Sequence, residues 1–213
     1  MLLSQRRQET GPASLSNHNE RGGAVVEAAF VLPLFIALIF GIVEISLYLY
    51  DLNATRAGAR QAARVASVSA TDAFADYNAL VQSRQSLANM ANKIDGVIIF
   101  RAETAGSTVP PECINALNTG SDGVADKCNV YTAAKYWNAD QLNFGFDSGS
   151  NADNTLWDRR WAPTGRNDAI TETTNADFVG VWVRVIHHSA TGIIPTKPLT
   201  AAFVFQIEPQ RAL

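Results

Sequence analysis

The stretch AAFVLPLFIALIFGIV, Ala28–Val43, decides the fold of this 213-residue chain. It carries no charge, and apolar residues extend it on both sides, past Glu27 and past Glu44. A helix over Ala24–Tyr50 is about 40 Å long at 1.5 Å per residue, which exceeds the roughly 30 Å of a bilayer core. The pattern predicts a single transmembrane helix; the alternative is the buried core helix of a soluble domain.

The composition of the whole chain narrows the function classes. Seventeen Lys and Arg face 20 Asp and Glu, so the net charge of −3 lacks the basic excess of a nucleic-acid-binding protein. The three histidines, His18, His187 and His188, are too few and too badly placed for most metal or nucleophile sites. No phosphate loop, nucleophile elbow or metal-binding helix motif occurs. We therefore expect no enzyme, no cofactor, no metal and no nucleic-acid partner.

Two features bear on the orientation of the span. Arg6, Arg7 and Arg21 precede it, which favours a cytoplasmic amino terminus, although three arginines also follow it. Cys113 and Cys128 lie in the carboxy-terminal part, where a bridge suits an oxidising compartment. Such a bridge would contribute roughly 3 kcal/mol; two unrelated buried thiols are the alternative. Both features favour an extracytoplasmic carboxy-terminal domain.

The residues before the span do not form an ordinary secretory signal. A polar start, MLLSQRRQETGPASLSNHNERG, precedes the apolar helix, whereas a secretory signal has a short basic start. The last residue of this polar start, Gly22, forms a glycine pair with Gly23, and Glu27 then stands inside the otherwise apolar helix start. An unpaired carboxylate in hydrocarbon costs about 2.5 kcal/mol or more, so we expect Glu27 to have a partner.

The segment RGGAVVEAAFVLPLFIALIFGIVEISLYLYDLNATRAGARQAA, residues 21–63, resembles the amino-terminal segment of TadE-like proteins. These are minor pilins (pseudopilins) of the tight-adherence (Tad) branch of type IV pili. The residues that carry the resemblance are Gly22, Glu27, Pro33, Gly41, Glu44, Asn53, Arg56, Gly58, Ala59 and Arg60. The sequence IEPQ, Ile207–Gln210, adds weaker support, and Ala28 departs from the aromatic that often follows the glutamate.

The resemblance implies how the amino terminus is processed. A prepilin peptidase would cut between Gly22 and Gly23 and remove residues 1–22 as a cytoplasmic leader. Glu27 would then be the fifth residue of the mature chain, able to pair with the new amine of its own or a neighbouring subunit. The implied partners are this peptidase, other pilins and minor pilins through the amino-terminal helix, the pilus assembly platform and the lipid membrane. The alternative is a flexible glycine hinge before a permanent signal anchor.

Residues 23–50 are expected as the transmembrane helix and residues 51–95 as an extracytoplasmic helix that continues from it. A small-residue stripe on one face permits close packing: Ala59, Ala62, Ala63 and Ala66. Arg56, Arg60 and Arg64 follow another face, as a solvated face or as a grip on lipid phosphates or acidic groups of an adjoining subunit. Thr71 and Asp72 could cap a second helix. We favour one helix with a weak point near Ser67–Asp72.

The remaining residues predict a small antiparallel sheet. Val97–Phe100 reads as a short strand, and Phe178–His187 alternates valines on one face with Phe, Trp and Ile on the other. Leu199–Ile207 reads as its antiparallel partner. The fold class is therefore α+β, with a long amino-terminal helix packed on a small antiparallel sheet in a 96–213 domain. This agrees with the pilin-like architecture that the resemblance implies. Residues 104–176 are expected as a long polar insertion, pinned by the cysteine pair and by aromatic packing.

Three lesser motifs point to no established chemistry. Asp147–Asp153 places oxygens at alternate positions but lacks the glycine and the glutamate of a calcium loop, so calcium is not expected. His187 and His188 are expected at the surface or at a strand edge. Trp157–Trp161 is a sugar- or partner-binding patch or, as we prefer, a local packing motif.

The predicted function is that of a minor pilin in the assembly or priming of a tight-adherence pilus. The chain would be a single-pass protein of the cytoplasmic (inner) membrane, with its amino terminus in the cytoplasm, or would enter the pilus. One alternative is a signal-anchored extracytoplasmic binding or adhesion domain outside any filament. The other is a membrane-tethered enzyme that uses the long polar region.

Overall fold

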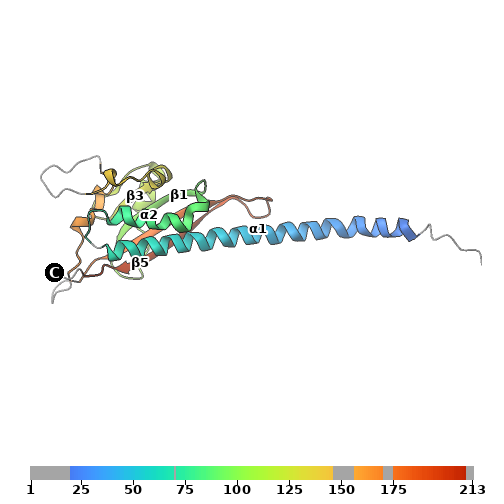
Figure 1. The fold of residues 1–213 in the computed structure, drawn as a ribbon, viewed down its shortest axis with the longest axis horizontal. Helices are drawn as coiled ribbons and strands as arrows, with labels where there is room; N and C mark the ends of the chain where they lie inside the picture. The colour runs from blue at the N-terminus through green and yellow to red at the C-terminus, as the bar shows by residue number, and fades with distance from the viewer. Residues whose placement is uncertain (1–19, 70, 146–155, 170–174, 210–213) are drawn as a thin grey trace, which may run out of the picture. The chain divides into compact units, whose positions relative to one another are not determined.

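The computed structural model describes residues 20–69, 71–145, 156–169 and 175–209 (Figure 1). Most of the expected leader and the calcium-like segment 147–153 lie outside the described residues. The chain divides into two compact units, Met1–Val43 and Glu44–Leu213. The first contributes the start of the long helix, and the second contains the rest of the helix and the sheet.

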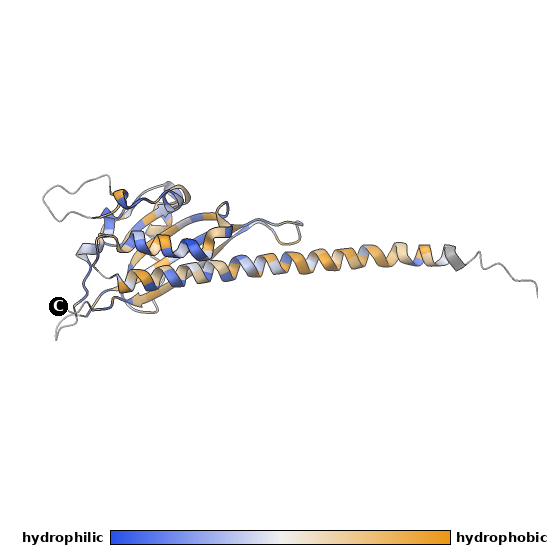
Figure 2. Cartoon of the chain, viewed as in Figure 1, coloured by the Kyte–Doolittle hydropathy of each residue, from blue (hydrophilic) through white to orange (hydrophobic). Residues whose placement is uncertain are grey.

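Helix α1, Glu20–Val68, contains Pro33 and is the long amino-terminal helix that the sequence predicts. Up to Val43 its described side chains are almost all exposed, and Figure 2 shows this part coloured as hydrophobic. Among the described residues this is the one helix that is long and apolar enough to cross a membrane, with 6% of its most apolar window buried. A helix that is apolar on all sides and not covered by protein fits a membrane anchor.

The single helix favoured over residues 51–95 is wrong, because the structure has two helices there. Helix α1 ends at Val68, and α2, Ala75–Leu87, is followed by the short helix η1, Ala88–Met90. The Asp72 Oδ1 accepts a hydrogen bond from the Phe74 amide at 2.7 Å. A side chain that bonds the nearby backbone competes with the helical pattern. The break thus falls next to the weak point expected near Ser67–Asp72.

Helix α2 folds back along α1. The Ser86 Oγ donates to the Gln61 Oε1 at 2.8 Å, and the Asn89 Nδ2 donates to the Tyr50 hydroxyl at 3.2 Å. Later residues of α2 and η1 thus lie beside earlier residues of α1, so the helices are antiparallel. The start of α2 consequently lies near the end of α1, far from Glu44.

The second unit contains a five-stranded antiparallel sheet with the strand order β2-β3-β1-β4-β5. The three predicted strands are present: β1 covers Ile94–Ala102, β4 covers Phe178–His187 and β5 covers Lys197–Gln206. Strands β4 and β5 pair in the predicted antiparallel way, with Val185 opposite Leu199. The α+β class is therefore confirmed.

The segment 104–176, expected as a polar insertion, instead supplies part of the sheet and its cover. It contains α3 (Pro111–Thr119), β2 (Gly123–Val124), β3 (Cys128–Thr132), α4 (Ala133–Trp137), η2 (Gln141–Asn143), η3 (Arg159–Trp161) and η4 (Pro163–Gly165). Strand β3 pairs with β1, with Val130 opposite Ile98. The sequence CNVYT is short and lacks clear alternation, and all but one of its residues are buried. A strand buried on both faces gives no period-2 signal, and this strand was therefore missed.

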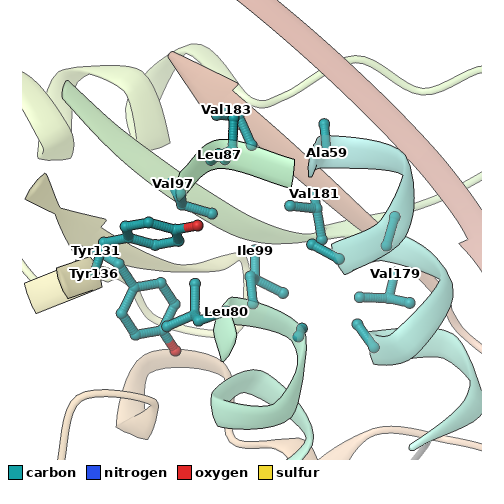
Figure 3. Close-up of a cluster of buried hydrophobic side chains, with 14 of the residues drawn as sticks. Ala59, Leu80, Leu87, Val97, Ile99, Tyr131, Tyr136, Val179, Val181 and Val183 are labelled. Carbon is teal, nitrogen blue, oxygen red and sulfur yellow. The ribbon is translucent and has the colours of Figure 1, made fainter. Parts of the chain in front are cut away.

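Both faces of the sheet are covered. On one face the alanine stripe of α1 and Leu80 and Leu87 of α2 pack on the β4 valines (Figure 3). On the other face α3 covers a second cluster that includes Phe100 and Trp182. The predicted alternation of β4 is thus confirmed, with its valines and its tryptophan in different clusters. The expected small-residue packing is confirmed too, because all four stripe alanines are fully buried.

Candidate functional site

The residues at the expected processing site belong to the first unit. Gly22, Gly23 and Glu27 lie in the first turns of α1 and are exposed. A Cβ atom added at either glycine would have nothing within 4 Å. Since residues four apart lie on one face of a helix, Glu27 stands one turn beyond Gly23 on the same side.

A buried carboxylate begins the second unit. Glu44 is fully buried, and its Oε2 accepts three hydrogen bonds from the loop between β4 and β5. The donors are the amide of Ala190 at 3.1 Å, the amide of Thr191 at 3.0 Å and the Thr191 hydroxyl at 3.0 Å. A charged acceptor makes such bonds stronger than neutral ones, so Glu44 fastens this loop to α1.

Further charged groups surround this carboxylate. The His187 Nε2 lies 3.5 Å from the Glu44 Oε1, and its Nδ1 lies 2.8 Å from the Asp51 Oδ2. The Lys93 Nζ donates to both oxygens of Asp51, at 2.9 and 2.8 Å. We call Glu44, Asp51, Lys93, His187 and Thr191 the Glu44 cluster. It joins α1, the residue before β1, the end of β4 and the following loop.

The expectation that His187 lies at the surface or at an edge is wrong. Its side chain is fully buried, whereas His188 is exposed as expected. The ring lies between two carboxylates and packs edge-on against Tyr48, with the ring centroids 5.3 Å apart. The Nδ1 faces Asp51, and the buried Nε2 faces Glu44 without a hydrogen bond to any described residue. The arrangement is suited to holding the fold together rather than to catalysis.

The cysteine pair expected to bridge does so in the structure. Cys113 of α3 and Cys128 of β3 form a disulfide. Both are fully buried on the α3 face of the sheet. The bond thus ties the covering helix to a strand of the sheet.

A second group of buried polar residues surrounds Asp76 of α2. Its carboxylate accepts hydrogen bonds from Arg166 at 2.5 Å, Asn129 at 2.8 Å and the Tyr131 hydroxyl at 2.8 Å. The Arg166 guanidinium also lies 4.1 Å from the centre of the Trp161 ring. These contacts attach η3 and η4 to α2 and β3.

Asp158 is buried close to this group. Its Oδ2 accepts from the Gly145 amide at 3.4 Å, and its Oδ1 has no hydrogen-bond partner within the described part of the chain. Burial, and to a lesser extent the negative charge of Asp76, raise the pKa of Asp158 to about 6. This carboxylate therefore opposes folding at neutral pH.

The other motifs from the sequence have structural surroundings. Trp161 is buried, and Trp157 packs edge-on against Phe144, which agrees with a local packing motif. Arg56, Arg60 and Arg64 are exposed along α1. Among the described residues, no group of three His, Cys, Asp or Glu side chains is placed to hold a metal ion.

Together these features define an α+β domain that follows one apolar helix among the described residues, and this helix fits a membrane anchor. Residues 22–64 match the model of the TadE-like protein family, which confirms the resemblance seen in the sequence. The match indicates involvement in a tight-adherence pilus system, and TadE-like pilus proteins are in general not enzymes. No curated protein and no solved structure matches the chain.

Proposed function

We propose that this chain is a minor pilin that takes part in assembling or priming a tight-adherence pilus. Prepilin peptidase cuts it between Gly22 and Gly23, and residues 1–22 are the leader. The start of α1 then anchors it in the cytoplasmic membrane, with the domain on the extracytoplasmic side. The family match over residues 22–64 supports this role, because it includes the glycine pair, Glu27 and the apolar helix.

The position of Glu27 carries the proposal. It is exposed on α1, in a stretch whose other described side chains are almost all apolar. A lone carboxylate in hydrocarbon is unfavourable unless it is paired. Cleavage before Gly23 creates an ammonium group one helical turn away, in the same subunit or in a neighbouring one packed alongside. This pairing favours a complex of pilin helices over an isolated anchor.

The partners follow from this role. Prepilin peptidase acts on the glycine pair, other pilins and minor pilins pack along α1, and the assembly platform receives the anchored chain. The exposed apolar helix before Glu44 provides the surface for helix packing, and it provides the lipid contact while the chain remains in the membrane. The second candidate, a signal-anchored binding or adhesion domain outside any filament, uses the same anchor but needs neither cleavage nor Glu27.

Two measurements on the protein from its native membrane separate these candidates. Amino-terminal sequencing should find chains that start at Gly23; chains that start at Met1 contradict the proposal. Glu27→Ala should remain membrane-bound but no longer co-purify with pilins after cross-linking. The matched control is Glu112→Ala, which removes a half-exposed carboxylate of the domain and should co-purify like the parent. Equal co-purification of both variants would favour the plain anchor.

A further inference from the structure

We propose that the loop between β4 and β5, residues 188–196, is a second membrane contact that inserts Ile193 into the lipid interface beside α1. We call this segment the β4–β5 loop. The inference rests on the membrane anchor of the proposed function. It goes beyond that function because it assigns a lipid-facing surface to the domain itself, with the bilayer as the binding partner.

The tip of the β4–β5 loop exposes apolar side chains, and two of its amides form hydrogen bonds within the loop. Ile193 is 56% exposed, Ile194 is half-buried and Pro195 is exposed. The Gly192 amide donates to the Ser189 hydroxyl at 2.6 Å, and the Ile193 amide donates to the Thr191 hydroxyl at 3.3 Å. Loop tips in water usually carry polar residues, so adjacent isoleucines at a tip suit a lipid environment.

The hairpin of β4 and β5 runs along the part of α1 that lies in the second unit, from Asp51 to Glu44. At the end of β4, His187 bonds Asp51; four residues later, Thr191 bonds Glu44. On α1 the seven residues from Asp51 back to Glu44 rise about 10 Å along the helix. The loop therefore follows α1 from Asp51 to Glu44, where residues 190 and 191 are bonded, and Figure 1 shows the β4–β5 hairpin beside α1.

Glu44 fixes the depth of this tip relative to the membrane. Three hydrogen bonds hold residues 190 and 191 of the loop to the buried carboxylate. Glu44 follows Val43, the last residue of the uncharged run, within one continuous helix. The loop is thus fastened at the point where the run ends. At the same level the helix exposes its own apolar side chains, among them Ile45 and Leu47.

The base of the β4–β5 loop, where β4 ends and β5 begins, carries residues that are typical of a membrane interface. The Lys197 Nζ lies 4.6 Å from the centre of the Tyr48 ring, and Lys197 is paired with His187 across the ladder. Lysine and tyrosine commonly sit at the headgroup level, with apolar residues deeper. From the base of the loop to its tip, the order is thus Lys197 and Tyr48, then Glu44, then Ile193. This order matches the polarity gradient of a lipid interface.

The test places one fluorescent label at a time on the full-length protein in phosphatidylcholine–phosphatidylglycerol vesicles. Both native cysteines are in the disulfide, so a single introduced cysteine is the only free thiol. Ile193→Cys reports on the loop tip, and Ile36→Cys reports on the anchor. Leu142→Cys is the matched control: it is an exposed apolar residue near Phe144, which packs on Tyr77 of α2, at the end of the domain remote from Glu44.

The lipid carries a nitroxide quencher at a shallow acyl position. A label at 193 should lose roughly half its fluorescence, as expected for a side chain in the outer acyl layer, whereas a label at 142 should be unchanged. Quenching at 36 but not at 193 overturns this inference and leaves the anchor intact. No quenching at 36 overturns the anchor and this inference together. The label at 193 could instead show a blue shift that the lipid quencher does not affect and that disappears when the protein is diluted. This result would indicate contact with a second copy of the chain and would also overturn the inference.

Discussion

The Nδ1 of His187 lies 2.8 Å from the Oδ2 of Asp51, although 136 positions separate the two residues in the chain. This contact joins the end of strand β4, which lies between β1 and β5, to α1, the helix that contains the apolar run. Lys93 reinforces it through both oxygens of Asp51. The charges next to the anchor thus form a structural junction, through which a force on α1 reaches the sheet.

We expect His187→Ala to destabilise the domain strongly. Removing one member of a buried, hydrogen-bonded charge group costs about 3 kcal/mol, because Asp51 and Glu44 lose a partner while they remain buried. For a chain of this size the melting temperature should fall by about 6 to 12 °C. The measurement is thermal unfolding in detergent, followed by tryptophan fluorescence.

The neighbouring histidine supplies the control for this prediction. His188 is exposed, so His188→Ala should melt within about 2 °C of the parent protein. Equal melting temperatures for the two alanine variants would contradict the structural role given to the buried ring.

Asp158 should make the stability depend on pH. Its pKa is about 6 in the folded protein against an ordinary value of 3.8, so between these pH values the folded state binds more protons than the unfolded state. Stability should therefore fall as the pH rises from about 4 to 6, by up to about 3 kcal/mol. Asp158→Asn should remove this loss.

The comparison of Asp158→Asn with the parent tests this sign. At pH 7 the variant should melt at the higher temperature, and near pH 3.5 the difference should shrink toward zero because both side chains are neutral there. A variant that is less stable than the parent at pH 7 would show that the ionised carboxylate is stabilising, against the prediction.

Gly58→Ala should loosen the packing of α1 on α2. A Cβ at this position would lie 2.8 Å from both Cγ and Cδ1 of Leu87, so the leucine has to move within the core. Overpacking of this kind costs about 1–3 kcal/mol. Gly41→Ala in the same helix is the control, since its Cβ has nothing within 4 Å. Thermal unfolding should show a lower melting temperature for Gly58→Ala only. An equal decrease for both variants would mean that the effect comes from the helix backbone and not from packing on Leu87.

The disulfide between Cys113 and Cys128 should contribute about 3 kcal/mol, as expected for a loop of this length. Reductant should then lower the melting temperature of the parent protein by about 6 to 12 °C. The double variant Cys113→Ser, Cys128→Ser should melt at the same temperature with and without reductant. A parent protein that is insensitive to a reductant shown by mass to have opened the bond would contradict this estimate.

Local patterns in the sequence were sufficient for the apolar helix and for three of the five strands, the central β1 with β4 and β5 beside it. The uncharged run Ala28–Val43 predicts an apolar helix, and the alternation in Phe178–His187 predicts a strand with two different faces. Both patterns lie within one element, because the helical and strand periods are properties of the local chain. In the same way, the alanine stripe of α1 predicted close packing. The family resemblance rests on the same amino-terminal segment, residues 22–64.

For other residues, the environment of the side chain depends on the tertiary structure. Glu44 stands in an apolar stretch and looks like a carboxylate in lipid, yet it is buried under the β4–β5 loop of the domain. The strand Cys128–Thr132 lacks alternation because neighbours cover both of its faces. Neither environment can be read from the residues on either side.

By itself, the sequence determined that an apolar helix leads into an α+β domain, because burial repeats with the period of each element. Only the tertiary structure decided that His187 is a core residue and that Glu44 holds a loop. Their partners come from segments more than 100 positions away, and no local period records which distant charge a buried group will meet.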